Sequence, residues 1–155
     1  MKKVALIVAG GKGERMNADI PKQFLLLNNL PILMHTIKQF SHFEEIVLVL
    51  PKSQFDYWNG LCKNNNFNQI HILVEGGETR FHSVKNGLDK IDNTSVVAIH
   101  DGVRPLISTA LINNLVGETK SGRGVIPIIP VKNSIRKIEG ENSVHIDRSN
   151  LYKVQ

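Results

Sequence analysis

The sequence predicts an α/β fold in which a mostly parallel, twisted sheet is flanked by helices. The first observation is an alternation of apolar, β-rich runs with amphipathic stretches, which is typical of β-α-β units. The second is size, because 155 residues with 41% hydrophobic content can bury one substantial core. The third is that the first apolar run breaks into a cluster of glycines. We therefore expect one domain spanning residues 1–155.

Five apolar runs are the expected strands, and four amphipathic stretches are the expected helices. The strands are residues 4–9, 46–50, 70–74, 96–100 and 124–129. In the first helix, Ile32, Leu33, Ile37 and Phe40 mark one face after Pro31, a residue suited to a first turn. The other helices are residues 54–63, 79–91 and 109–120, the last capped by Ser108.

Beyond Pro130 the periodicity is lost. Residues 131–137 and the Gly140-Glu141-Asn142 segment predict two polar strands joined by a turn. Such an arm, residues 131–148, cannot bury itself.

The loop after the first run has the composition of a phosphate site. It reads Gly10-Gly11-Lys12-Gly13-Glu14-Arg15-Met16, and Pro21-Lys22-Gln23-Phe24 follows. Glycines let backbone N–H groups approach an anion, and the following helix adds its positive N-terminal end. Arg15 and Lys22 would add mobile charge. The spacing matches neither a P-loop nor G-x-G-x-x-G. A strand-to-helix turn whose glycines serve tight geometry alone is the alternative.

Two other segments are expected beside this loop, because ligands sit at the carboxyl ends of parallel strands. The first is residues 76–84, in which two glycines offer amides while Glu78 and Ser83 offer hydrogen bonds to a base edge. An ordinary turn is the alternative there. The second is residues 100–105, with Asp101 and Arg104 on either side of Gly102. For these two charges the alternative is a structural ion pair.

Composition narrows the class of protein. The net charge of +5 comes from scattered basic residues without interleaved aromatics, which favours an anionic small substrate over nucleic acid. No apolar run is long enough to cross a bilayer, so no membrane role is expected. The single cysteine, Cys62, favours the cytoplasm and a packing role. The six histidines show no zinc-site spacing, so no metal site built by the protein is expected.

The glycine loop is similar to the A-G-G-x-G-x-R-M signature of nucleotidyltransferases that activate sugar and polyol phosphates. Within that superfamily, residues 21–24 resemble the cytidylyltransferases acting on 2-C-methyl-D-erythritol 4-phosphate or ribitol 5-phosphate. The resemblance extends over residues 3–155. It implies a Rossmann-like fold with a protruding β-arm and transfer of CMP from CTP to a polyol phosphate, with release of pyrophosphate. For the methylerythritol enzymes this is a step of non-mevalonate isoprenoid precursor synthesis.

The resemblance also implies roles for individual residues. Those that wrap the triphosphate are Ala9, Gly10, Gly11 and Gly13, and those that contact its phosphates as catalytic groups are Arg15 and Lys22. Those that read cytosine are Gly77, Glu78 and Ser83. Those that face the ribose and the incoming polyol phosphate are Asp101 and Arg104, with Gly102 keeping the backbone open.

The arm of the family hooks a second subunit and delivers substrate-binding groups across the interface of a homodimer. By resemblance these groups are Ser134, where the family usually has Thr, and Arg148. A surface ion pair of Arg148 with Asp147 or a neighbour is the alternative. The resemblance further implies a divalent ion, most simply Mg²⁺, bound through the CTP phosphates.

The substrate is the finer question. Gly10 is seen in the ribitol type, whereas Asp147-Arg148 followed by residues 151–155 resembles the methylerythritol branch, which we favour. Ribitol-5-phosphate cytidylyltransferase is the second hypothesis, and a non-catalytic nucleotide-binding subunit is the third. The joint presence of Arg15, Lys22, Asp101 and Arg104 argues against the third. The family continues beyond the position matching Gln155, so we expect this chain to lack the C-terminal part.

Overall fold

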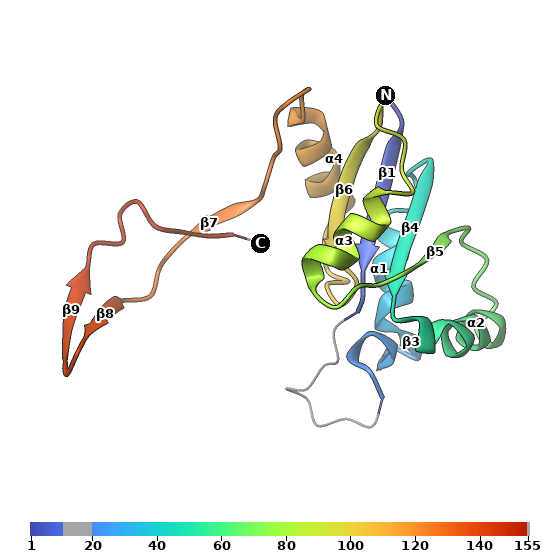
Figure 1. The fold of residues 1–155 in the computed structure, drawn as a ribbon, viewed down its shortest axis with the longest axis horizontal. Coiled ribbons are helices and arrows are strands. Elements are labelled where there is room, and N and C mark those ends of the chain that lie inside the picture. Colours follow the sequence, from blue (N-terminus) through green and yellow to red (C-terminus); the bar gives the residue numbers. More distant parts are fainter. Residues whose placement is uncertain (11–19, 155) are drawn as a thin grey trace. The chain divides into compact units, whose positions relative to one another are not determined.

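The computed structural model describes residues 1–10 and 20–154. The chain divides into two compact units, residues 1–113 and residues 114–155. Figure 1 shows the helices and strands of both.

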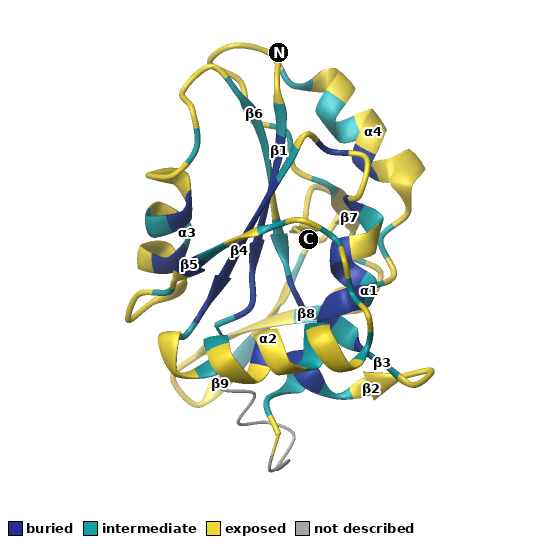
Figure 2. Cartoon of the chain, turned by 90° about the vertical axis from the view of Figure 1, so that its right-hand side faces the viewer, coloured by how far each residue is buried: buried dark blue, intermediate teal, exposed yellow. Residues whose placement is uncertain are grey.

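A parallel four-stranded sheet forms the centre of the first unit. Its strand order is β5-β4-β1-β6, and all three pairings are parallel. The strands are β1 (Lys3–Val8), β4 (Glu45–Leu50), β5 (Ile72–Glu75) and β6 (Val96–Asp101). The central strands β1 and β4 are buried along almost their whole length, as Figure 2 shows in dark blue. Their continuous apolar runs are what a parallel sheet covered on both faces requires.

Helices cover the two faces of this sheet. The α-helices are α1 (Ile32–Gln39), α2 (Phe55–Asn64), α3 (Arg80–Leu88) and α4 (Thr109–Glu118). Figure 2 shows α3 on the face opposite α1. Gly87 allows α3 to pack closely, since a Cβ there would lie 2.3 Å from Leu6 Cδ1 and 3.0 Å from Val49 Cγ2. Two short 3₁₀ helices, Lys22–Phe24 and Lys52–Gln54, each follow a proline.

A buried aromatic cluster joins the first 3₁₀ helix to α2. Phe24 lies 6.2 Å from Trp58, centroid to centroid, and Trp58 contacts Phe67. The Trp58 indole N–H donates to His71 Nε2 at 2.8 Å, so the one polar group of this fully buried side chain has a hydrogen-bond partner. Between the 3₁₀ helix and α1, β2 (Leu26–Leu27) and β3 (Leu30–Pro31) form a hairpin. Asn28 and Asn29 take the positive φ angles that its two-residue turn needs.

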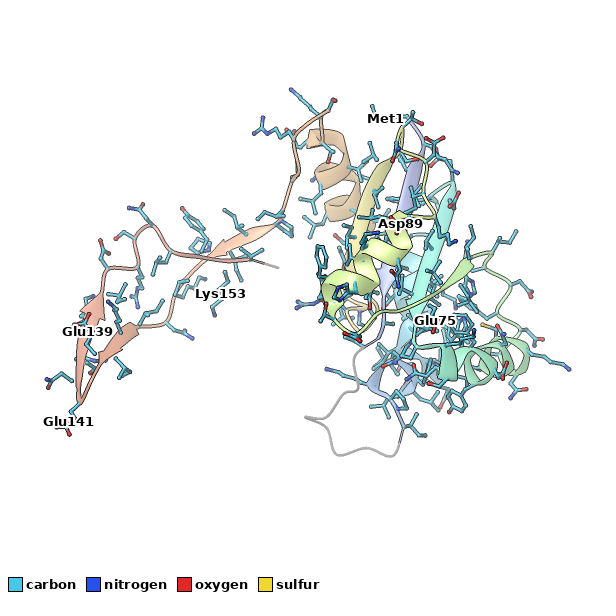
Figure 3. The ribbon with its side chains drawn as sticks, viewed as in Figure 1. Met1, Glu75, Asp89, Glu139, Glu141 and Lys153 are labelled. Atoms are coloured by element: carbon cyan, nitrogen blue, oxygen red, sulfur yellow. The ribbon has the colours of Figure 1, made fainter. Side chains whose placement is uncertain are left out.

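The second unit contains two antiparallel strand pairs. The strands are β7 (Ile128–Pro130), β8 (Ile135–Glu139), β9 (Asn142–Ile146) and β10 (Tyr152–Val154). β8 pairs with β9 through a turn at Gly140, whose φ is +61°, and β7 pairs with β10. Figure 3 places Glu141 at the closed end of this hairpin. None of the residues 114–154 is buried.

Most elements match the sequence-based expectation, with corrections at specific places. The α/β class, the parallel sheet, the four helices and the two-stranded arm are confirmed. Pro31 precedes α1 rather than forming its first turn, and α3 ends at Leu88. The expectation that residues 124–129 form another strand of the parallel sheet is wrong. Only residues 128–130 form a strand, and its partner is the antiparallel β10.

Candidate active site

The carboxyl ends of β1, β5 and β6 bring three loop segments to one edge of the sheet. Because the strands are parallel, all of them end on that edge. The Ala9 N–H donates to the Val49 carbonyl and the Gly76 N–H to the Leu50 carbonyl, both at 2.9 Å. The Gly102 N–H likewise donates to the Val8 carbonyl at 2.8 Å. The described part of the glycine loop therefore lies between the other two segments.

Gly102 and Ala9 are in close contact. Asp101 pairs with Val8 in the register of β1 and β6, so the residues that follow meet at the strand ends. A Cβ on Gly102 would lie 2.7 Å from Ala9 Cβ and 2.9 Å from Leu33 Cδ1. Thr36 Oγ1 of α1 donates to the Gly102 carbonyl at 2.8 Å. This position therefore needs glycine for close approach, and its carbonyl is fixed by a buried hydroxyl.

Ser83 fixes the second segment and lies close to Gly10 at the start of the glycine loop. Its side chain is buried, and Oγ accepts the Gly77 N–H at 3.1 Å. A Cβ on Gly10 would lie 3.9 Å from the same Oγ. Thr79 caps α3 by accepting the His82 N–H at 3.3 Å. Ser83 thus shapes the Gly77 backbone, and reading of cytosine by Gly77, Glu78 and Ser83 stays a prediction.

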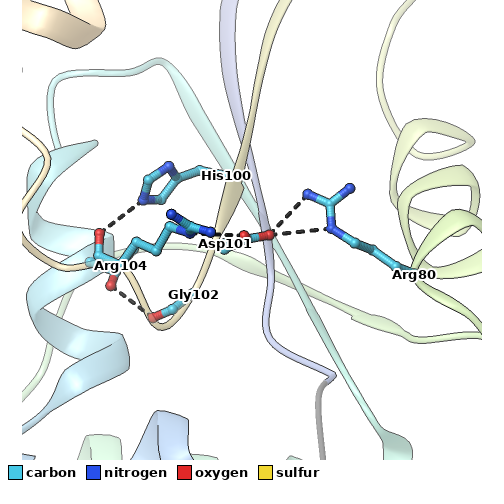
Figure 4. Close-up of polar contacts among 6 residues, drawn as sticks. Arg80, His100, Asp101, Gly102 and Arg104 are labelled. Atoms are coloured by element: carbon cyan, nitrogen blue, oxygen red, sulfur yellow. Dashed lines mark hydrogen bonds and ion pairs between the residues drawn. The ribbon is translucent and has the colours of Figure 1, made fainter. Parts of the chain in front are cut away.

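The Asp101 carboxylate lies between two arginines (Figure 4). Arg80 donates to Oδ1 from Nη2 at 2.9 Å and from Nε at 3.3 Å. Arg104 donates to Oδ2 from Nε at 3.1 Å. Burial alone would raise the pKa of Asp101, but the hydrogen bonds and charges of Arg80 and then Arg104 outweigh it and lower that pKa. Asp101 is therefore an ionised carboxylate at neutral pH.

His100 supports the Arg104 loop beside this ion cluster. Its Nε2–H donates to the Arg104 carbonyl at 3.0 Å, and its ring lies 5.1 Å from that of Phe40. Burial lowers the pKa of His100, so the imidazole is neutral at neutral pH. The predicted Asp101–Arg104 ion pair is present, and the sequence reading missed its third member, Arg80. The sequence feature that could have indicated Arg80 is a cation directly after the helix cap Thr79.

Lys22 lies at the first position of the 3₁₀ helix that follows Pro21. Its neighbour Gln23 is 1% exposed and ties this helix to the end of β1. Gln23 Nε2 donates to the Ala9 carbonyl at 2.9 Å and to Gln54 Oε1 at 2.8 Å. The tetrad that carried the family resemblance is therefore attached directly to the loop at Ala9.

Not every predicted site residue can be located at this edge. Gly11, Gly13 and Arg15 lie outside the described residues. Ser134 and Arg148 belong to the second unit, where both are exposed and flank the open end of the β8–β9 hairpin, since Ile135 pairs with Ile146. The Asp147 carboxylate accepts the Ser149 N–H and hydroxyl, and no ion pair of Arg148 is present in residues 1–10 and 20–154. Their roles stay predictions.

Other candidate chemistry is weaker. Burial raises the pKa of Cys62 to about 11, which keeps it a thiol and supports a packing role. Within residues 1–10 and 20–154, no group of three or more His, Cys, Asp or Glu side chains could hold a metal ion. In the same part of the chain, no helix has both the length and the apolar character needed to span a membrane.

Comparison with known proteins identifies the family. Residues 3–155 match the model of the 2-C-methyl-D-erythritol 4-phosphate cytidylyltransferases. A curated protein of that name from Azobacteroides pseudotrichonymphae is 48% identical over 99% of this chain and 71% of its own length. The one from Bacteroides fragilis is 45% identical over 100% of this chain and 72% of its own length.

Solved structures agree with this match. The 4-diphosphocytidyl-2C-methyl-D-erythritol synthase of Anaerococcus prevotii superposes with a TM-score of 0.80 at 26% identity, over 99% of this chain and 67% of that one. The cytidylyltransferase of Thermus thermophilus gives 0.76 at 26% identity, over 100% and 68%. Motif, fold and relatives lead to the same conclusion. The chain belongs to the 2-C-methyl-D-erythritol 4-phosphate cytidylyltransferase family.

Proposed function

We propose that this protein transfers CMP from CTP to 2-C-methyl-D-erythritol 4-phosphate and releases pyrophosphate, as a step of isoprenoid precursor synthesis. Family membership supports the reaction. The observation that carries it within this chain is the meeting of three loop segments at one sheet edge. There the chain that follows β1 at Ala9 and Gly10, the Gly76–Gly77 turn after β5 and the Asp101 ion cluster of β6 come to the same edge.

The chemistry is an in-line displacement at phosphorus. An oxygen of the polyol phosphate attacks the α-phosphorus of CTP, and a new P–O bond forms. The bond from the α-phosphorus to the bridging oxygen breaks, and pyrophosphate leaves with the electron pair. No general base is required, because a phosphate monoester with a second pKa of about 6 is largely ionised at neutral pH. Catalysis then consists of positioning the reactants and offsetting their negative charge.

We assign the offsetting charge to Arg15 and Lys22. The described structure supports Lys22, because Gln23 anchors its helix to the Ala9 carbonyl at the end of β1. Asp101 would face the ribose and Arg104 the polyol phosphate. The two guanidinium groups around one carboxylate leave one net positive charge at the sheet edge, which favours an anionic substrate.

A divalent ion, which we propose is Mg²⁺, would be carried by the triphosphate. Residues 1–10 and 20–154 contain no acidic cluster able to hold it unaided. Mg²⁺ commonly keeps several waters and takes one or two carboxylates together with substrate phosphates, so this part of the chain fits an ion bound mainly by CTP. When bound, the ion would neutralise phosphate charge.

The test is pyrophosphate release by this protein from CTP in the presence of Mg²⁺. Methylerythritol 4-phosphate and ribitol 5-phosphate are offered in parallel. Lys22→Ala should lower kcat by about 10²–10³-fold with a smaller change in KM, because the lost charge acts mainly in the transition state. Lys52→Ala is the matched control, since Lys52 also begins a 3₁₀ helix after a proline. It should retain activity.

Each outcome separates the hypotheses. Release with methylerythritol phosphate alone, lost in Lys22→Ala, supports the proposal. Release with ribitol phosphate alone would assign the chain to the second polyol. CTP binding without release from either would leave a nucleotide-binding protein and overturn the proposed activity.

We further propose that the protein is a cytoplasmic homodimer assembled through the β8–β9 arm, with Ser134 and Arg148 contacting substrate across the interface. The arm supports this, because a two-stranded hairpin is marginally stable by itself in water. It also carries Ile138 and Val144 at 72% and 43% exposure. Contact with a second copy would cover such side chains.

A further inference from the structure

Arg80 is the one member of the Asp101 cluster to which the sequence assigns no role. It is the first residue of α3, and two of its nitrogens contact Asp101 Oδ1, while Arg104 holds Oδ2. Each carboxylate oxygen therefore has its own arginine from a different segment. Such a pair of contacts fixes both the position and the rotation of the carboxylate.

Stability gives little reason for this arrangement. The Arg80 side chain is 62% exposed and that of Asp101 is 31% exposed, and ion pairs at such surface positions contribute little to folding. The first turn of α3 also contains no acidic residue, so Arg80 places a cation at the positive end of the helix dipole, which is unfavourable. Asp101 offsets that cost only if it stays beside Arg80.

The position of the Arg80–Asp101 contact within the candidate site explains it better than stability does. Arg80 follows the Gly76–Thr79 loop, whose Gly77 is held by Ser83, and Asp101 precedes Gly102, which contacts Ala9. The Arg80–Asp101 contact therefore links the segment expected to take the base to the segment expected to take the ribose and polyol phosphate.

We propose that Arg80 is a positioning residue of the active site, which orients the Asp101 carboxylate and joins the α3 loop to the end of β6. This inference rests on the proposed function, because it takes Asp101 as a substrate-facing group. Arg80 acts through Asp101 and not by its own contact with phosphate.

The first experiment needs no turnover. The Asp101 carboxyl is titrated by ¹³C NMR in the free protein, in wild type, Arg80→Gln and Lys85→Gln. Lys85 is the matched control, since it lies on the same helix and forms an exposed ion pair with Asp89, the residue that follows the helix. Arg80→Gln should raise the pKa of Asp101, because a hydrogen bond and a positive charge are lost, and Lys85→Gln should leave it unchanged. If the pKa of Asp101 is the same in Arg80→Gln as in wild type, the proposal that Arg80 orients the Asp101 carboxylate is wrong.

The second experiment is a double-mutant cycle of Arg80→Gln with Asp101→Asn, read as kcat/KM and as CTP affinity by calorimetry. Alone, Arg80→Gln should lower kcat/KM about 10-fold or more while its melting temperature shifts by no more than about 2–4 °C. In the Asp101→Asn background, Arg80→Gln should change kcat/KM and the CTP affinity each by less than about twofold. Arg80→Lys should recover activity only in part, because an ammonium lacks the planar fork.

The outcomes distinguish the two proposals. Independent, multiplying effects of Arg80 and Asp101 would mean that Arg80 contacts substrate itself, and the positioning role would be wrong. If wild type releases no pyrophosphate with either polyol, the proposed function fails, whereas the NMR titration still decides whether Arg80 holds Asp101.

Discussion

At the scale of single residues, the close approach of Gly102 to Ala9 joins the ends of β1 and β6. We expect Gly102→Ala to destabilise the fold by about 1–3 kcal/mol, because its Cβ would lie 2.7 Å from Ala9 Cβ and 2.9 Å from Leu33 Cδ1. Urea unfolding measures the change. Gly60→Ala is the control: it lies in α2 with nothing within 4 Å of an added Cβ, and it should stabilise by about 0.5–1 kcal/mol. Equal effects at both sites would contradict the close-contact explanation.

A second residue-scale prediction concerns pH. Burial lowers the pKa of His100, so the folded state binds this proton less readily than the unfolded chain. The unfolded chain takes up the proton near pH 6.5, and stability is therefore lost as pH falls from about 6.5 toward the lower folded-state pKa. Urea unfolding at pH 7.0 and 5.5 should show a larger loss for wild type than for His100→Gln. An equal loss would rule out His100 as the cause.

At the scale of elements, Gln23 connects the Lys22 helix, β1 and the second 3₁₀ helix. We expect Gln23→Met to cost about 1–3 kcal/mol, because the Ala9 carbonyl loses its buried donor. Activity should fall as well, since the neighbouring Lys22 is no longer anchored beside Ala9. Thermal unfolding and pyrophosphate release measure the two effects.

Gln54→Met is the matched control for Gln23. It removes only the 2.8 Å contact from Gln23 and leaves the Ala9 bond in place. Its loss of activity should be the smaller of the two. A greater loss in Gln54→Met would show that the link to the second 3₁₀ helix, rather than to β1, sets the position of Lys22.

At the scale of the whole molecule, the arm is expected to decide assembly. Ile138→Asp should convert the protein to monomers at micromolar concentration, because it places a charge on an apolar side chain that is 72% exposed in the single chain. Sedimentation velocity measures the change. Asn142→Asp adds the same charge in the same hairpin, at the start of β9, and should leave a dimer. A wild-type protein that sediments as a monomer would contradict the proposal.

The sequence predicted the elements whose signal is local. The apolar runs of β1 and β4 read as buried parallel strands, and Ser108 caps α4 through the Leu111 N–H at 3.2 Å, as expected. Residues 124–129 were also apolar, yet only the last two lie in a strand. A hydrophobic pattern shows that a segment tends to be extended, but whether that segment pairs with another strand depends on the rest of the chain.

By itself, the sequence determined the family and the α/β class and proposed the candidate site residues, because these depend on local pattern and on motifs of fixed spacing. Only the tertiary structure showed that Arg80 binds Asp101, 21 positions away. It likewise showed the hydrogen bonds of Ser83 with Gly77 and of Gln23 with Ala9. The Arg80–Asp101 contact forms because β5 and β6, which are distant in sequence, end at the same sheet edge. The charges at that edge follow from composition, whereas their pairing follows from how the strands and helices pack.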